Sequence, residues 1–89
     1  MSATLAVRQH IHDYPTWRMV YDELEPLRMQ HGCTADRVMQ LPGDDHEVFV
    51  THDFTTAEQA DSFARDPALR EGMGRGGVEQ ARLEIFTDI

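Results

Sequence analysis

The stretch TADRVMQLPGDDHEVFVTHDF, residues 34–54, contains two β-strand patterns that are joined by a turn. Residues 34–41 form the first predicted strand, and the Pro42-Gly43-Asp44-Asp45 sequence after it is typical of a turn. Alternation along residues 47–54 places one set of side chains on a common face of the second strand: Val48, Val50, His52 and Phe54. We therefore predict an antiparallel hairpin.

The segments on either side of this hairpin each contribute a strand and a helix. A strand is predicted at 4–12, and Asp13 can cap the helix that follows it. After the hairpin, a helix begins at Thr55-Thr56 and restarts at Asp66-Pro67, and the last strand covers 81–88. The order is βαββαβ, which predicts a single ferredoxin-like α+β domain over residues 1–89, with a four-stranded antiparallel sheet and helices on one face. The glycines at 72, 74, 76 and 77 predict a mobile connection before the last strand.

Apolar side chains occur on both faces of two predicted strands. Phe49 opposes Val48 and Val50, and Phe86 opposes Leu83 and Ile85. Two helices can cover only one face of a four-stranded sheet, so an apolar second face would stay in water. We expect this face to bury itself against a second copy, which gives a homodimer closed around a two-sheet barrel.

Composition excludes several classes of protein. The chain has 16 acidic and eight basic residues, a formal net charge of −8, and no cluster of basic residues. This charge repels phosphate backbones, so we expect no binding to nucleic acid. We also expect no membrane span, no signal peptide and a cytoplasmic location, because no apolar run has the required length. A single cysteine, Cys33, cannot form an internal disulfide.

Four segments of the chain resemble a known family. They are 7–17 (VRQHIHDYPTW), 25–32 (EPLRMQHG), 45–48 (DHEV) and 62–70 (SFARDPALR). Together they are similar to the dimeric α+β barrel proteins grouped with antibiotic biosynthesis monooxygenases. The resemblance implies the dimeric barrel and a pocket for a small molecule. Members of the group include cofactor-independent oxygenases of aromatic polyketides, haem-degrading enzymes and cyclase-like proteins.

The sequence departs from the catalytic branches of this group at identifiable positions. The oxygenases typically use an asparagine and a tryptophan in the pocket, whereas this chain has no asparagine and its one tryptophan, Trp17, begins the first predicted helix. The haem-degrading branch has a histidine on the helix after the third strand, and no histidine occurs between Thr56 and Arg75. We therefore expect no cofactor.

The residues best suited to proton transfer are histidines on the first strand. His10 and His12 share a strand face, and imidazole exchanges protons near neutral pH. In a pocket between sheet and helices, His10 is our candidate general base, or a group that orients a ligand carbonyl. Arg8 lies on the same face and is a candidate for binding an anionic ligand or for a salt bridge. Two histidines without a third ligand are weak support for a metal site, so we predict none.

Other candidates for the pocket are aromatic. Tyr14 and Trp17 are expected to form a wall that stacks on a flat ligand, or simply part of the core. His52 and His12 are further candidates for ligand contacts, with packing as the alternative for His52.

Two functions from different classes remain open. The first is an enzyme that performs cofactor-independent oxygenation or cyclisation of an aromatic or polyketide-like molecule. The second is a non-catalytic or stress-associated protein of the same fold that binds a small ligand. The absent asparagine favours the second, and the resemblance favours the first. A purely structural assembly module is a third alternative.

Overall fold

Strands and helices alternate along the chain in the predicted order, with each of the two helical segments divided in two. The computed structural model describes residues 2–89. The elements are β1 (Ala3–Ile11), α1 (Tyr14–Glu23), α2 (Glu25–Gln30), β2 (Ala35–Leu41), β3 (Asp44–Phe54), α3 (Ala57–Arg65), α4 (Pro67–Arg75) and β4 (Val78–Thr87). The ferredoxin-like α+β prediction is confirmed.

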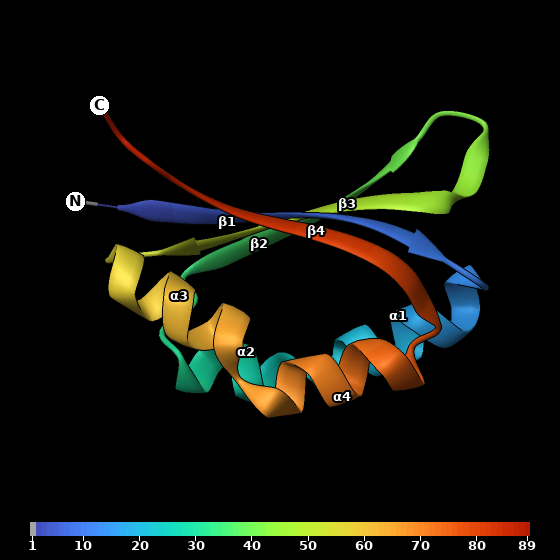
Figure 1. Ribbon diagram of the computed structural model, residues 1–89, viewed down its shortest axis with the longest axis horizontal. Coiled ribbons are helices and arrows are strands. Elements are labelled where there is room, and N and C mark those ends of the chain that lie inside the picture. The colour runs from blue at the N-terminus through green and yellow to red at the C-terminus, as the bar shows by residue number, and fades with distance from the viewer. Residues whose placement is uncertain (1) are drawn as a thin grey trace.

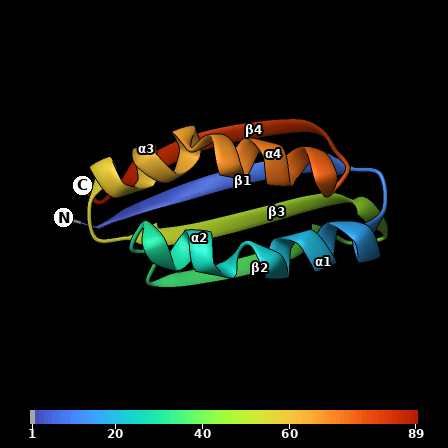
Figure 2. The same cartoon turned by 90° about the horizontal axis from the view of Figure 1, so that it is seen from below.

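The four strands form one antiparallel sheet in the order β2-β3-β1-β4. All four helices lie on one side of this sheet (Figure 1). Seen from below, α1 and α2 run along the β2–β3 half, and α3 and α4 run along the β1–β4 half (Figure 2). None of the helices in residues 2–89 combines the length and apolar character that crossing a membrane requires.

The helix boundaries follow from capping and from proline. The Asp13 side chain accepts a hydrogen bond from the Thr16 backbone N–H at the start of α1, as predicted. Pro26 lies in the first turn of α2, where its missing N–H costs nothing, and this explains the break at Leu24. In α3, Thr56 and Gln59 complete a capping box.

The core lies between the sheet and the helices. Val48, Val50, His52 and Phe54 are at most 4% exposed, which confirms the predicted buried face of β3. On β1 the corresponding face carries Leu5, Val7, Gln9 and Ile11, also buried.

Two predictions near the C-terminus were wrong. Gly72 and Gly74 lie inside α4 rather than in a mobile connection, and β4 begins at Val78, earlier than expected. Gly72 is buried, and a Cβ atom built there would lie 2.7 Å from Leu24 Cδ1. The glycine thus allows α4 to approach the end of α1 closely.

No helix or strand of residues 2–89 covers the sheet face opposite the helices. Phe49 is 38% exposed and Phe86 is 56% exposed on this face, and Leu41 at the end of β2 is 49% exposed. We call this surface the open face. It holds the apolar side chains that the sequence placed opposite the core.

Candidate functional site

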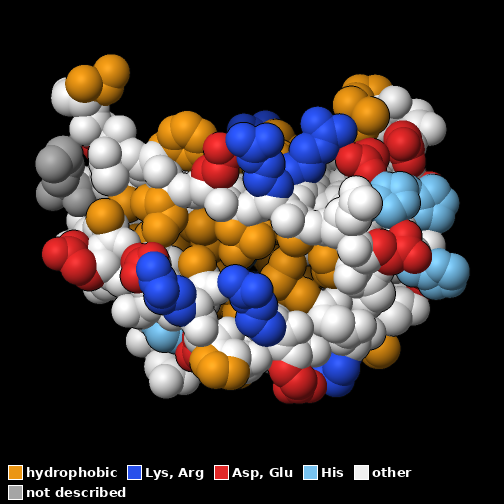
Figure 3. All heavy atoms as spheres, in the orientation of Figure 1, with side chains coloured by type: hydrophobic (Ala, Val, Ile, Leu, Met, Phe, Trp, Pro, Cys, Tyr) orange, Lys and Arg blue, Asp and Glu red, His pale blue; other side chains and the backbone are white. Residues whose placement is uncertain are grey.

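A cavity lies between the helix-facing side of the sheet and helices α1, α2 and α4. Its mouth opens between the edge strand β4 and α4, where hydrophobic side chains are visible in a hollow of the surface (Figure 3). The lining is mostly apolar, with a few polar groups: Val7, Gln9, Trp17, Val20, Tyr21, Leu24, Arg28, His52, Phe63, Leu69, Gly72, Met73, Gly76 and Leu83.

The cavity is narrow in this structure. About 470 Å³ is free of atoms when the open mouth is counted, but the centre of a water-sized sphere can move within only about 40 Å³. That is room for a few water molecules. A ring-sized ligand therefore needs side chains at the mouth to move, and the flexible thioether of Met73 lies among them.

One wall of the cavity is a stack of aromatic rings. Trp17 and Tyr21 lie one helical turn apart on α1, and their ring centroids are 4.9 Å apart with an angle of 20° between the planes. Trp17 Nε1 donates a hydrogen bond to Gln9 Oε1 across 3.1 Å, so the indole is fixed against β1. The wall is rigid and largely apolar, and the two stacked rings cover one face of each other.

His52 is the buried titratable group of this cavity. It is 4% exposed, and its ring packs between Tyr21, at 6.1 Å, and Phe63, at 5.1 Å between centroids. Its Nδ1 is buried without a hydrogen-bond partner among residues 2–89. Burial lowers the pKa of His52 from 6.5 to about 4, with the positive charge of Arg28 as the second cause. The imidazole is therefore neutral at pH 7.

Arg28 brings a buried positive charge to the same cavity. It is 6% exposed, its Nη1 donates to the Tyr21 carbonyl oxygen across 2.8 Å, and its guanidinium lies 4.0 Å from the centre of the Tyr21 ring. The Tyr21 hydroxyl donates to Asp36 Oδ2. Burial, followed by this hydrogen bond, raises the pKa of Tyr21, so the phenol stays protonated.

The arrangement combines a rigid, largely apolar wall with a cation and a neutral imidazole. Such a site can hold a flat molecule, accept a proton at His52 and stabilise the resulting negative charge beside Arg28.

The structure places the predicted His10 site elsewhere. His10 lies on the open face and not between sheet and helices, so its predicted location in that pocket was wrong. Its Nδ1 contacts Glu47 Oε2, and its Nε2 lies 3.4 Å from Glu79 Oε1. Arg8 on the same face forms a salt bridge with Glu47 at 3.0 Å, which is the second of the two roles predicted for it. The alternation of β1 turns Gln9, not His10, toward the helices.

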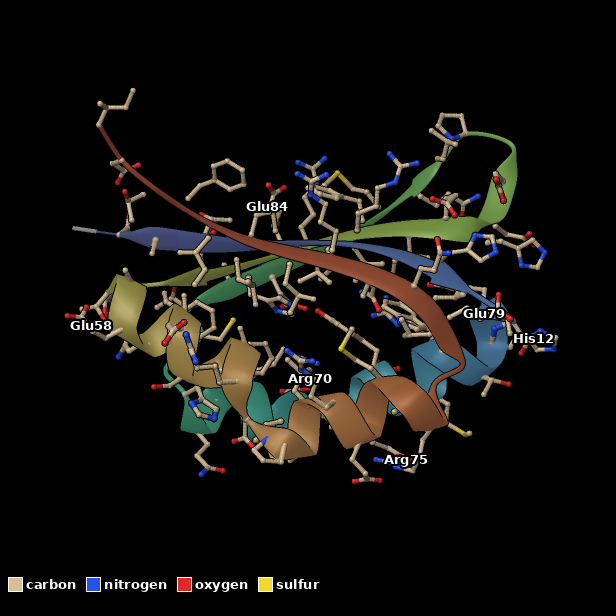
Figure 4. All side chains as sticks on the ribbon, in the orientation of Figure 1. His12, Glu58, Arg70, Arg75, Glu79 and Glu84 are labelled. Atoms are coloured by element: carbon tan, nitrogen blue, oxygen red, sulfur yellow. The ribbon has the colours of Figure 1, made fainter. Side chains whose placement is uncertain are left out.

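His12 also lies outside the cavity. β1 ends at Ile11 after a register shift, and His12 stands exposed at the end of the molecule where Glu79 also lies (Figure 4). Residues 2–89 contain no group of three or more His, Cys, Asp or Glu residues that could hold a metal ion.

The structure brings only part of the predicted set together. Trp17 and His52 both line the cavity, whereas Tyr14 packs against Trp17 at 5.9 Å without lining it. Arg28 and Gln9 also line the cavity and were not among the predicted residues. A signal was present for Gln9, a polar residue on the otherwise apolar face of β1, whereas Arg28 follows the break at Leu24, beyond which the spacing of α1 no longer predicts a face.

Comparison with known proteins identifies the fold. No protein-family model and no curated protein matches the sequence. Solved structures do match. The cofactor-independent oxygenase SnoaB from Streptomyces nogalater superposes with a TM-score of 0.81 at 12% identity, over 99% of this chain and 93% of that one. A putative antibiotic biosynthesis monooxygenase from Bordetella bronchiseptica gives a TM-score of 0.80 at 9% identity, over 99% and 97%.

A conserved protein from Methanosarcina mazei Go1 is similarly close, with a TM-score of 0.79 at 9% identity over 100% of this chain and 94% of that one. The similarity to the antibiotic biosynthesis monooxygenase group that the sequence suggested is thus confirmed for the fold. At these identities the match carries no information about the reaction.

Proposed function

We propose that the protein binds a small aromatic or polyketide-like molecule in the cavity between the sheet and the helices, and that it catalyses cofactor-independent oxygenation or cyclisation of that molecule. The observation that carries the proposal is the pair formed by Arg28 and His52. A buried cation and a buried imidazole with an unpartnered Nδ1 meet at the same apolar cavity. Perturbed polar groups in an apolar pocket are a common mark of a functional site.

The chemistry follows from proton transfer to His52. A phenol or an acidic C–H that is held against Trp17 and Tyr21 loses its proton to the neutral imidazole. The substrate anion beside the ring then raises the pKa of His52, because an opposite charge favours the imidazolium. An electron-rich anion of this kind reacts with O₂ itself: a CH₂ group becomes C=O, and the second oxygen atom leaves in water. Without O₂, the same anion can attack an internal carbonyl and close a ring.

A second function, ligand binding without turnover, is favoured by one observation. The chain lacks the asparagine that the similar oxygenases use. In this case the protein sequesters or senses its ligand, as expected of a non-catalytic or stress-associated protein. Saturable binding with no product distinguishes this function from the enzyme.

We further propose that the open face is the interface of a homodimer. Phe49 and Phe86 supply apolar area there, and the salt bridges Arg8–Glu47 and Arg82–Glu84 supply charges of both signs. A surface with both signs can face a second copy of itself across a two-fold axis without net repulsion. The cavity lies on the other side of the sheet, so this dimer leaves its mouth free.

The test is a ligand screen by thermal shift with quinols, flavonoid-like phenols and haem, in which oxygen uptake is measured for every compound that stabilises the protein. Stabilisation with oxygen uptake and no added cofactor supports the oxygenase. Replacement of His52 by Phe should then lower turnover by about 10²–10⁴-fold, whereas His12→Gln, at an exposed site outside the cavity, should not change it.

His10→Ala decides between the two histidine sites. Full activity of this variant places the reaction at the cavity. Loss of activity in a variant that still folds would place it at the open face and would contradict the role of His52.

A further inference from the structure

Arg28 is a buried cation whose charge no acidic side chain of the protein neutralises directly. No Asp or Glu oxygen lies within 4.0 Å of its nitrogens among residues 2–89, although the chain has 16 acidic residues. Most other arginines lie on the surface, and those at 8, 18, 65, 75 and 82 are all paired with carboxylates. The most buried arginine of the chain is therefore one that lacks a pair.

The hydrogen bonds of Arg28 leave most of its donors unused. A guanidinium has five N–H donors, and the only hydrogen bond that its side chain makes within the described residues is the one from Nη1 to the Tyr21 carbonyl oxygen. Asp36, the acid nearest in the network, accepts the Tyr21 hydroxyl instead. Arg28 lines the cavity on the same side of the sheet as His52, and it also borders a surface groove between α1, α2 and the start of β2, where Arg18 and Asp36 lie.

A second polar group is available beside it. His52 stacks on the Tyr21 ring, over which the Arg28 guanidinium also lies, and its buried Nδ1 has no partner among residues 2–89. A buried charge without a partner is costly to stability, and a buried donor or acceptor without a partner is costly as well. One ligand group with oxygen acceptors could satisfy both.

We propose that the ligand of this cavity is an aromatic acid, whose anionic oxygen pairs with the guanidinium of Arg28 and hydrogen-bonds to His52 Nδ1. The inference rests on the proposed function, because it names the class of molecule that the same cavity takes. The anionic group is a carboxylate, or a phenol or enol that is ionised when bound. The planar donor fork of arginine suits such an oxygen better than a neutral carbonyl.

The experiment compares two probes of the same shape, 2-naphthoate and 2-naphthamide, by isothermal titration calorimetry at pH 7. Charge-assisted hydrogen bonds inside a protein are worth about five- to tenfold in affinity over the neutral pair. We expect the wild-type protein to bind 2-naphthoate tighter by at least that lower factor. In Arg28→Gln the preference should vanish, while affinity for 2-naphthamide stays within about threefold.

Arg18→Gln is the matched control. Arg18 also lies over the Tyr21 ring, at 5.4 Å, but it is paired with Asp22 at 3.2 Å and does not line the cavity. It should keep the preference for the anion. If Arg28→Gln does not fold, the wild-type comparison still decides the question, and Arg28→Lys, which keeps the charge, should retain part of the preference.

The outcomes separate this inference from the function on which it rests. Equal affinity of both probes for the wild type would overturn the inference and leave the cavity as a binding site. An equal effect of Arg18→Gln and Arg28→Gln would overturn it too, since the anion would then lie in the surface groove between α1, α2 and β2, which both arginines line. Binding of neither probe nor of any quinol would count against the cavity itself.

Discussion

The burial of His52 makes a quantitative prediction about stability and pH. The folded pKa of about 4 lies below the value of 6.5 for a free imidazole. Below pH 6.5 the unfolded chain therefore binds a proton at this site that the folded protein does not take up. The contribution of neutral, buried His52 to the free energy of unfolding is fully present above pH 6.5. It decreases as the pH falls and decreases no further below about pH 4.

The size of the effect follows from these two pKa values. The full difference corresponds to about 3 kcal/mol of unfolding free energy, and the part between pH 7 and pH 5 to about 2 kcal/mol. The perturbation is His52→Phe, which removes the titrating group and keeps a ring between Tyr21 and Phe63. Between pH 7 and pH 5, the free energy of unfolding should fall by about 2 kcal/mol more in the wild type than in the variant.

The assay is urea denaturation followed by circular dichroism at a fixed protein concentration, at half-unit steps from pH 7.5 to 4. His12→Gln is the control, because His12 is exposed. Other titrating groups, such as the His31–Asp66 pair, change in both proteins and cancel in the difference. Curves for wild type and His52→Phe that fall in parallel, within about 0.5 kcal/mol, would refute the claim that His52 is buried in its neutral form.

Three further changes test the structure around the cavity. Trp17→Phe removes the donor to Gln9 and should cost about 1–3 kcal/mol in chemical denaturation, because the buried amide oxygen loses its partner; a cost near zero would mean that the bond contributes nothing. Gly72→Ala brings a Cβ against Leu24 and should cost about 1–3 kcal/mol while narrowing the cavity, so any ligand found by thermal shift should bind more weakly. Thr56→Ala removes the cap of α3 and should cost about 1 kcal/mol with unchanged ligand affinity.

The open face carries a prediction that is independent of the cavity. Phe49→Asp replaces an apolar ring of this surface by a charge and should raise the dimer dissociation constant by at least about tenfold, because the interface loses apolar area and a carboxylate must be desolvated instead. Sedimentation velocity across a range of protein concentrations measures the change, with the exposed Glu58→Gln on α3 as the control. A wild type that stays monomeric at high concentration would contradict the homodimer.

Local sequence determined the elements of this fold and their faces. The alternation of Val48, Val50, His52 and Phe54 predicts a strand with one buried side, because side chains in a strand repeat with period two. Asp13 marks the start of α1 through a hydrogen bond within one turn of chain. The two prolines mark the starts of α2 and α4, where a missing N–H costs nothing. These features depend on neighbours in sequence, and the order βαββαβ then leaves few ways to form the sheet.

Tertiary structure decided which side chains form the cavity. Alternation separates His10 from Gln9, but whether a functional group faces the helices or the open face depends on where the helices pack. Arg28 follows a proline break, so the direction of its side chain depends on how α2 packs rather than on the period of α1. Arg28 and His52 come together only because α1–α2 and β3 lie against each other in the folded chain. Their burial, and the lowered pKa of His52 that results from it, depend on contacts between segments that the sequence pattern leaves far apart.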